Sequence, residues 1–503
     1  MINQTGGIAA SERRAAPILV AVALLVAMLG PAALVMEVPT SILAIVVGLL
    51  GLVVLALRPD VATLLVVAIV YSNAAVVAVR VHNVPFTLAA GTTFLLAVPL
   101  GYYLLVRRER LIIPPAVPWI LGYLIVQLVS TMFARDSALA SQAVATFVAE
   151  GLLLYLLVVN AVRTERMALA VVCVLLAVGA ALAALSLHQQ LTGSFTNEYL
   201  GFAHVGGDPT RVVAESRTAG PFDGANRYAQ ILVLLLPLVF TIVWGRYSRR
   251  ATVLAIGAGA LISVAIALTL SRGAAVGFAL VLAVMVARRY IKLRHMAVVA
   301  VAVVALIFAV PQFGTRLESL EGVPGVAGEG VQADGSIQSR ITEMIAAALV
   351  FVDHPIIGVG PNQFPSYYID YAEEFGLLVR TEDREAHNLY VGVAAESGLL
   401  GSIFFFGAIG VTIRELVRTR SRMLHVHPRL AYLATGFMLA IVAYLTTGIF
   451  LHLAFERYLW LIMALGAAVS AMALRTEAAG HEAAADSAPD LAATPAVVQR
   501  SPA

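Results

Sequence analysis

The sequence predicts an all-α polytopic membrane protein with about 12–14 transmembrane helices and a large extracytoplasmic loop containing short helices. The first observation is composition: 60% of the 503 residues are hydrophobic, only 13% are charged, and the mean hydropathy is +0.90. Such a chain is too apolar for a soluble globular protein. The second observation is that the apolar runs are long and unbroken, whereas a membrane β-barrel needs short segments of alternating polarity. The spans are therefore helices, which satisfy their own backbone hydrogen bonds.

Apolar runs of spanning length divide the chain into three regions. A polar cytoplasmic tail of residues 1–16 precedes the first run, and the membrane domain covers 17–475. The C-terminal residues 476–503 are rich in Ala, Pro and Ser, which predicts a disordered cytoplasmic tail. The apolar runs lie at 17–36, 40–57, 61–79, 86–106, 116–133, 142–162, 167–189, 228–245, 251–270, 273–287, 296–312, 389–413, 430–451 and 458–474. Some are short or contain proline, so the number of spans could fall by about two.

The basic residues predict the orientation of the spans, because cytoplasmic connections retain Lys and Arg. If the N-terminus is inside, the inner connections carry most of the arginines, with groups at 107–110, 246–250 and 414–429. The short outer connections carry little more than Arg80, Arg135, Arg272 and Arg457. We therefore expect both termini in the cytoplasm.

Two long connections, 190–227 and 314–387, then lie on the outer side. In the second, Ile341, Ile345, Ala348 and Val352 recur at helical spacing, which predicts an amphipathic helix over 339–352. A turn rich in Pro and Gly follows, and then a segment with five aromatic residues, Phe364, Tyr367, Tyr368, Tyr371 and Phe375. Such a segment suits the membrane interface or the stacking of sugar rings. Loops of this length are usually functional or disordered.

Three spans that begin on the outer side carry polar residues where they begin. These are Asn226 with Arg227, Ser271 with Arg272, and His387 with Asn388. Helix N-termini offer unpaired N–H groups and the positive end of the helix dipole, so cationic side chains beside them form an anion site. The natural anion at a membrane surface is a lipid phosphate or diphosphate. A histidine in the same place can take a proton from a hydroxyl, so the pattern fits transfer of a sugar from a lipid diphosphate.

These residues also have structural interpretations. Arg227 can be an interfacial anchor, and His387 can be an N-capping residue. Arg340, at the start of the amphipathic helix, can pair with Glu343. Anchoring explains Arg272 less well, because the connection that holds it has hardly two residues.

A resemblance to a known family rests on these residues. His387 and Asn388, followed by Gly398 and Gly401, resemble the signature of the O-antigen ligase and polymerase superfamily. Ser271–Gly273 is similar to the family's arginine at the outer start of a span, and residues 339–360 are similar to its long-loop pattern. GPFDGANRYA, residues 220–229, resembles the Gly and Asn segment before an earlier span. The resemblance covers residues 215–405 and departs from the family pattern at Met344, where Leu is common.

The resemblance implies a metal-independent glycosyltransferase of the bacterial cytoplasmic membrane that builds cell-envelope polysaccharide on the outer face. The donor would be a glycan on undecaprenyl diphosphate, and the acceptor a lipid, a glycan or a protein. Membrane lipids are further expected partners, while nucleic acid and cofactors are not. Arg272 and Arg340 would hold the diphosphate and His387 would act on the acceptor hydroxyl. The residues expected to bind substrate are Arg217, Asn226, Arg227, Ser271 and Asn388.

Three functions remain open. A ligase would move a finished glycan to a lipid or protein acceptor, and a polymerase would join lipid-linked repeat units. A transporter of lipid-linked glycans should carry polar residues throughout its spans or a repeated half, and it is disfavoured because the polar residues concentrate at the outer surface. The outer loops also lack the closely spaced carboxylates or histidines of a dedicated metal site. Glu150, inside an apolar run, is costly to bury, and it is either functional or held by a buried hydrogen bond.

Overall fold

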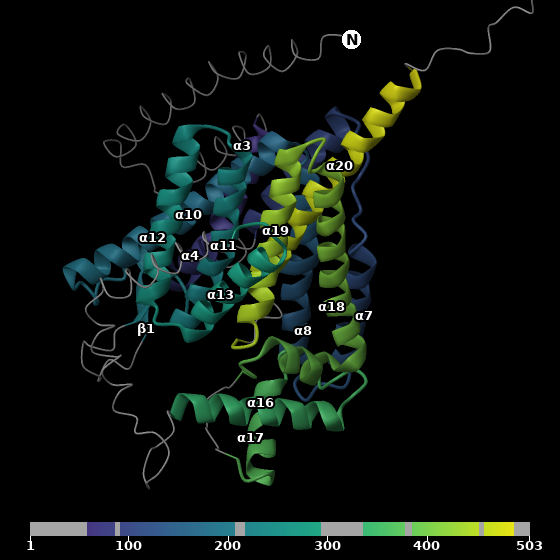
Figure 1. The fold of residues 1–503 in the computed structure, drawn as a ribbon. Helices are drawn as coiled ribbons and strands as arrows, with labels where there is room; N and C mark the ends of the chain where they lie inside the picture. The colour runs from purple at the N-terminus through teal and green to yellow at the C-terminus, as the bar shows by residue number, and fades with distance from the viewer. Residues whose placement is uncertain are drawn as a thin grey trace, which may run out of the picture.

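The computed structural model describes residues 58–85, 91–206, 217–292, 335–377, 385–451 and 457–486. These residues form a bundle of helices with one two-stranded hairpin (Figure 1). The predicted spans at 17–36, 40–57 and 296–312 lie outside the described residues.

Seven helical stretches of the described residues are long and apolar enough to cross a membrane. They are α8–η3–α9 (Ser137–Thr146, Phe147–Leu153, Leu154–Ala161), α10 (Glu165–Thr192), α11 (Ala225–Gly245), α12 (Arg249–Leu268), α18 (Leu389–Met423), α19 (Pro428–Thr447) and α20 (Arg457–Asp486). An eighth span results if α3 (Pro59–Tyr71) and α4 (Ala74–His82), bent by 60°, are counted as one. Shorter apolar stretches are η1–α6–η2 (Thr92–Leu96, Ala97–Gly101, Tyr102–Val106), α7 (Val117–Thr131) and α13 (Arg272–Ala287). The predicted all-α membrane fold is thus confirmed.

Polar side chains fix the starts of several spans by accepting hydrogen bonds from otherwise unpaired N–H groups. Asp136, Thr164, Ser248, Ser271 and Asn388 do this for α8, α10, α12, α13 and α18. Helices α11, α19 and α20 are the most enclosed of the spans, whereas α12 leaves Val253 and Leu254 exposed, as expected for a lipid-facing helix.

The first long loop holds a short 3₁₀ turn, η4 (Tyr199–Gly201), and the antiparallel strands β1 (His204–Gly206) and β2 (Arg217–Gly220). Asp223, in the turn after β2, pairs with Arg80 of α4 at 2.6 Å. The Asn73 side chain, between α3 and α4, donates to the Pro221 carbonyl at 2.6 Å. The loop is therefore fastened to the end of the bundle just before α11 begins.

The described part of the second long loop contains α16 (Gly335–Asp353) and α17 (Phe364–Glu374), and α16 lies across one end of the bundle (Figure 1). The amphipathic helix predicted over 339–352 is therefore present. In contrast to a helix of a soluble protein, it exposes part of its apolar stripe and buries the opposite side. Ile341 and Val352 of the apolar stripe are 53% and 68% exposed, while Ala346, Ala347 and Val350 on the other side are buried against α17. The exposed stripe continues at Ile356, which is 65% exposed.

The aromatic segment at 364–375 does not present its rings as a sugar-stacking or membrane-facing surface. Tyr367, Tyr368 and Tyr371 are buried in the small core between α16 and α17, and only Phe375 is exposed. Arg135 of the bundle stacks over the Tyr367 ring at 3.5 Å and pairs with Asp370 at 2.5 Å. The rings therefore build the small subdomain of α16 and α17 and dock it on the bundle.

Helix α18 is interrupted at Gly398, whose φ of 62° and ψ of −166° are not helical. The turn at 355–360 is inserted at this break. Four backbone hydrogen bonds join the two segments: Val359 N to Ala395 O (3.0 Å), Gly360 N to Glu396 O (2.9 Å), Leu399 N to Pro355 O (2.8 Å) and Leu400 N to Ile356 O (3.1 Å). A β-carbon at Gly398 would overlap the backbone of Ile356, and one at Gly358 would overlap the backbone of Glu396. Two glycines thus permit the contact between α18 and the second long loop.

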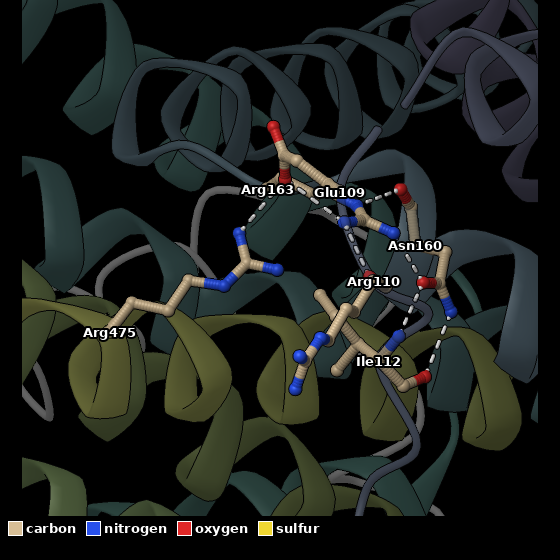
Figure 2. Close-up of polar contacts among 6 residues, drawn as sticks. All are labelled: Glu109, Arg110, Ile112, Asn160, Arg163 and Arg475. Carbon is tan, nitrogen blue, oxygen red and sulfur yellow. Dashed lines mark hydrogen bonds and ion pairs between the residues drawn. The ribbon is translucent and has the colours of Figure 1, made fainter. Parts of the chain in front are cut away.

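A buried arginine organises the opposite end of the bundle (Figure 2). The Arg163 side chain, after α9, is 1% exposed and pairs with Glu109 at 3.0 Å. It also donates to the Arg110 carbonyl at 3.0 Å and to the side chain of Asn160 at 2.6 Å, while Asn160 bonds both backbone groups of Ile112. Arg475 of α20 reaches Glu109 at 3.5 Å, so the cluster ties the 109–112 connection to two helices. Helix α20 continues to Asp486, beyond the boundary at 475 that we expected.

Candidate active site

The N-terminal ends of α13 and α18 meet around the last turn of α19. Leu389 N, at the start of α18, donates to the Gly448 carbonyl at 2.7 Å, and the Asn388 amide donates to the Ile449 carbonyl at 3.0 Å. A β-carbon at Gly273, in the first turn of α13, would lie 3.0 Å from Phe450. Asn388, Ser271 and Arg272 are thus brought together, although they are far apart in the sequence. The N-cap of α18 is Asn388 and not His387, for which capping was the structural interpretation, so the predicted substrate-binding residue Asn388 also has a structural role.

The turn between α12 and α13 is fastened to the start of α11 by Arg217. Its guanidinium donates to the Thr269 carbonyl at 2.8 Å and to the Asn226 side chain at 2.8 Å. Ser271 caps α13, and the neighbouring Arg272 is exposed. Of the predicted substrate-binding residues, Arg217, Asn226 and Ser271 therefore hold the local fold, while the side chain of Arg272, predicted to hold the diphosphate, is exposed.

Arg227 connects α11 to the segment that carries His387. Its guanidinium lies 3.3 Å from the Glu385 carboxylate, two residues before His387. Both side chains are partly exposed. The pair places the start of α11 beside the histidine, although an exposed pair of this kind contributes only about 0.2–1 kcal/mol to stability.

His387 adopts a left-handed backbone conformation, with φ of 45°, immediately before the N-cap of α18. Its Nδ1 atom lies 2.9 Å from the Glu385 carbonyl oxygen and 2.9 Å from a carboxylate oxygen of Glu343. The Glu343 side chain is 1% exposed, whereas the histidine ring is partly accessible. Burial lowers the pKa of His387, but the hydrogen bond and the negative charge of Glu343 outweigh it and raise the pKa above its ordinary value.

Arg340 lies on α16, one turn before Glu343. Its positive charge opposes protonation of His387 and so acts to lower the pKa of that ring, which places the guanidinium within electrostatic range of it. The structure thus gathers all eight predicted site residues at one end of the bundle, on strand β2, on the starts of α11, α13 and α18, and on α16. Glu343 and Glu385 were not predicted as site residues. The signal for Glu343 was its spacing of three residues from Arg340, which puts both on one side of a helix.

A second polar cluster at the same end gives Glu150 its partner. Arg457, the first residue of α20, pairs with Glu150 at 2.7 Å and also donates to the Asn73 side chain. Arg457 is thus more than an interfacial anchor, because it forms an ion pair with the Glu150 carboxylate in the apolar span. Since Asn73 also holds Pro221, the cluster braces the first long loop before α11.

Comparison with known families agrees with the arrangement of these residues. Residues 257–406 match the family model described as O-antigen ligase. The chain carries an O-antigen ligase domain. The matched range contains Ser271, Arg272, Arg340, His387 and Asn388, and it begins after Arg217, Asn226 and Arg227. No curated protein matches the chain. The matched domain of this multi-pass membrane protein is therefore of the O-antigen ligase and polymerase type.

Proposed function

We propose that this O-antigen ligase-domain protein transfers a glycan from undecaprenyl diphosphate to an acceptor hydroxyl on the outer face of the cytoplasmic membrane. The observation that supports it most is the placement of His387: a partly accessible imidazole, held by a buried carboxylate, at an end of the bundle where arginines gather. A base for the acceptor and cations for a diphosphate leaving group are the two requirements of such a transfer.

In the proposed step, the imidazole of His387 takes the proton of the acceptor hydroxyl while the acceptor oxygen forms a bond to the anomeric carbon of the donor. The bond from that carbon to the diphosphate oxygen breaks, and the diphosphate leaves with the electron pair. A single displacement inverts the anomeric carbon. Arg272 and Arg340 offset the charge that develops on the leaving diphosphate, and the histidinium then releases its proton to water.

The ligase function, with a lipid or protein acceptor, is our first proposal, and polymerisation of lipid-linked repeat units is the alternative. The purified protein, given an undecaprenyl-diphosphate-linked repeat-unit glycan isolated from the producing cells, distinguishes them. Chains that lengthen with donor alone indicate a polymerase, and product that forms only after a second acceptor is added indicates a ligase. No product from folded protein in either case contradicts the proposal.

The variant His387→Ala tests the role of the base. It should lower product formation by about 10²–10⁴-fold, the usual contribution of a general base, while the protein still inserts in the membrane. His425→Ala, at the other end of α18, is the matched control and should keep full activity, since it lies at the exposed end far from the proposed site. Wild-type activity in His387→Ala would remove the catalytic assignment.

The proposed orientation has its own test. In a Cys173→Ser background, Glu373→Cys on α17 should react with a membrane-impermeant thiol reagent in intact cells. His425→Cys should react only after the cells are opened. The reverse pattern would place the site at the cytoplasmic face and would contradict the proposed reaction at the outer face.

A further inference from the structure

We propose that Glu343 is the positioning residue of His387: it fixes the ring proton on Nδ1 and leaves Nε2 as the atom that receives the acceptor's proton. The inference rests on the proposed function, because it assigns an atom to the base in that reaction. It also makes a statement about the ring itself that can be measured without any substrate.

The tautomer follows from the two neighbours of Nδ1. The Glu385 carbonyl oxygen and the Glu343 carboxylate oxygen each lie 2.9 Å from this nitrogen. A carbonyl oxygen and an ionised carboxylate can only accept hydrogen bonds. A neutral imidazole in this position must therefore carry its hydrogen on Nδ1, since the other tautomer would set a nitrogen lone pair against two oxygens. The lone pair of the neutral ring is then on Nε2.

The charged groups around the ring determine how basic Nε2 is. Glu343 and Arg340 face it from α16, Glu385 precedes it in the chain, and Arg227 of α11 faces it through Glu385. Burial and the Arg340 charge lower the pKa of His387, while the hydrogen bond and charge of Glu343 raise it. The negative charge of Glu343 stabilises the imidazolium that forms during transfer, as the carboxylate of a Ser-His-Asp triad does for its histidine.

The fold holds the carboxylate in place. Glu343 lies on the buried side of α16, next to Ala346, Ala347 and Val350, which pack on α17. The turn after α16 is bonded to α18 on both sides of Gly398. Glu343 and His387 are therefore carried by segments that are joined at two points. A group that orients a base needs such support, because small displacements of a base from its productive geometry are costly in rate.

Kinetics of Glu343→Gln test the proposal. Glutamine keeps the size of the side chain and can still accept from Nδ1–H, but it lacks the charge. Turnover should fall by about 10- to 100-fold, less than for loss of the base, with little change in the KM for the lipid-linked donor. The acid limb of the pH–rate profile should move to lower pH, because the histidine loses the negative charge that favours its protonation. Glu373→Gln, which neutralises an exposed carboxylate of the same subdomain, is the matched control and should leave rate and profile unchanged.

The ring tautomer is measured by ¹⁵N NMR of protein labelled in its histidines, with His387→Gln used to assign the signals. Above the pKa of the ring, hydrogen should remain on Nδ1 in the wild type. Hydrogen on Nε2, or a Glu343→Gln enzyme with wild-type turnover and an unmoved acid limb, would overturn the inference. Because the NMR experiment uses no donor, an inactive wild-type protein with the expected tautomer would count against the proposed function alone. An active enzyme with the other tautomer would count against this inference alone.

Discussion

Gly398 offers the sharpest test of how the small subdomain of α16 and α17 is attached to the bundle. Its φ of 62° and ψ of −166° lie in a region that is essentially restricted to glycine. A β-carbon there would overlap the carbonyl carbon and oxygen of Ile356. We therefore expect Gly398→Ala to force the 355–360 turn away from α18.

The magnitude follows from two contributions. The backbone conformation costs about 1–3 kcal/mol for a residue with a side chain. Relief of the overlap requires movement of the turn, which breaks at least two of the four backbone hydrogen bonds across the break at about 1 kcal/mol each. The contact should thus be destabilised by about 3–5 kcal/mol.

The matched control is Gly410→Ala, in the same helix, where no atom lies within 4 Å of an added β-carbon. Alanine is favoured over glycine in a helix by up to about 1 kcal/mol, so the control should be neutral or stabilising. Limited proteolysis of the 335–377 segment, unfolding in detergent and glycan assembly should separate the two variants. Gly398→Ala should show a cleavable second long loop and lost activity with the bundle still inserted. Equal proteolysis, stability and activity in both variants would refute the reasoning.

Three further predictions concern charged residues. Arg163→Ala should lower the free energy of unfolding by about 1–3 kcal/mol, because it removes the buried donor to the Asn160 side chain and to the Arg110 carbonyl, while the partly exposed Glu109 keeps Arg475 as its partner. Arg475→Ala, at an exposed pair, should change it by less than about 1 kcal/mol; both are measured by unfolding in detergent. The folded-state pKa of His387 is raised, so its contribution to stability should be complete below pH 6.5 and should be lost as pH rises through the folded pKa, measured as wild type minus His387→Ala across pH. Arg227→Gln should reduce turnover while unfolding changes by less than about 1 kcal/mol, because the partly exposed pair with Glu385 orients the histidine segment more than it stabilises the fold. A large loss of stability in Arg227→Gln would contradict that division of roles.

The sequence alone was sufficient for the described spans and for the prediction that the candidate site residues lie at one end of the bundle. Hydropathy predicts each described span. The prediction that a helix begins at the His387–Asn388 pair is confirmed, because an asparagine cap is a local signal. The gathering of Arg272, Arg340 and His387 at one end was predictable from the parity of the spans. These features depend on short stretches of chain or on the membrane itself, so they need no knowledge of distant contacts.

Features that depend on distant contacts were not predictable in this way. The run at 389–413 is long and mostly apolar, so its sequence predicts one uninterrupted helix. The break exists because the turn at 355–360 supplies alternative backbone partners. Glu343 was likewise weighed only as a partner of Arg340, because its contact with His387 spans 44 positions. The apolar stripe of α16 was visible in the sequence, but composition does not say whether lipid or protein covers such a stripe.

The exposed aliphatic stripe of α16 has a consequence for how a donor could reach the histidine. The exposed aliphatic surface formed by Ile341, Ile345 and Val352 continues through Ile356 to Leu400 of α18, which is also exposed. The aliphatic side of the bundle therefore extends to the helix that carries Arg340 and Glu343. An aliphatic surface of this kind rests at the boundary between lipid and headgroups. A long polyprenyl tail would then remain in the bilayer in contact with this aliphatic surface, and only its diphosphate and sugar would reach the polar end of the bundle. Substrate would arrive sideways from the lipid, and the water-facing opening would be left for the acceptor.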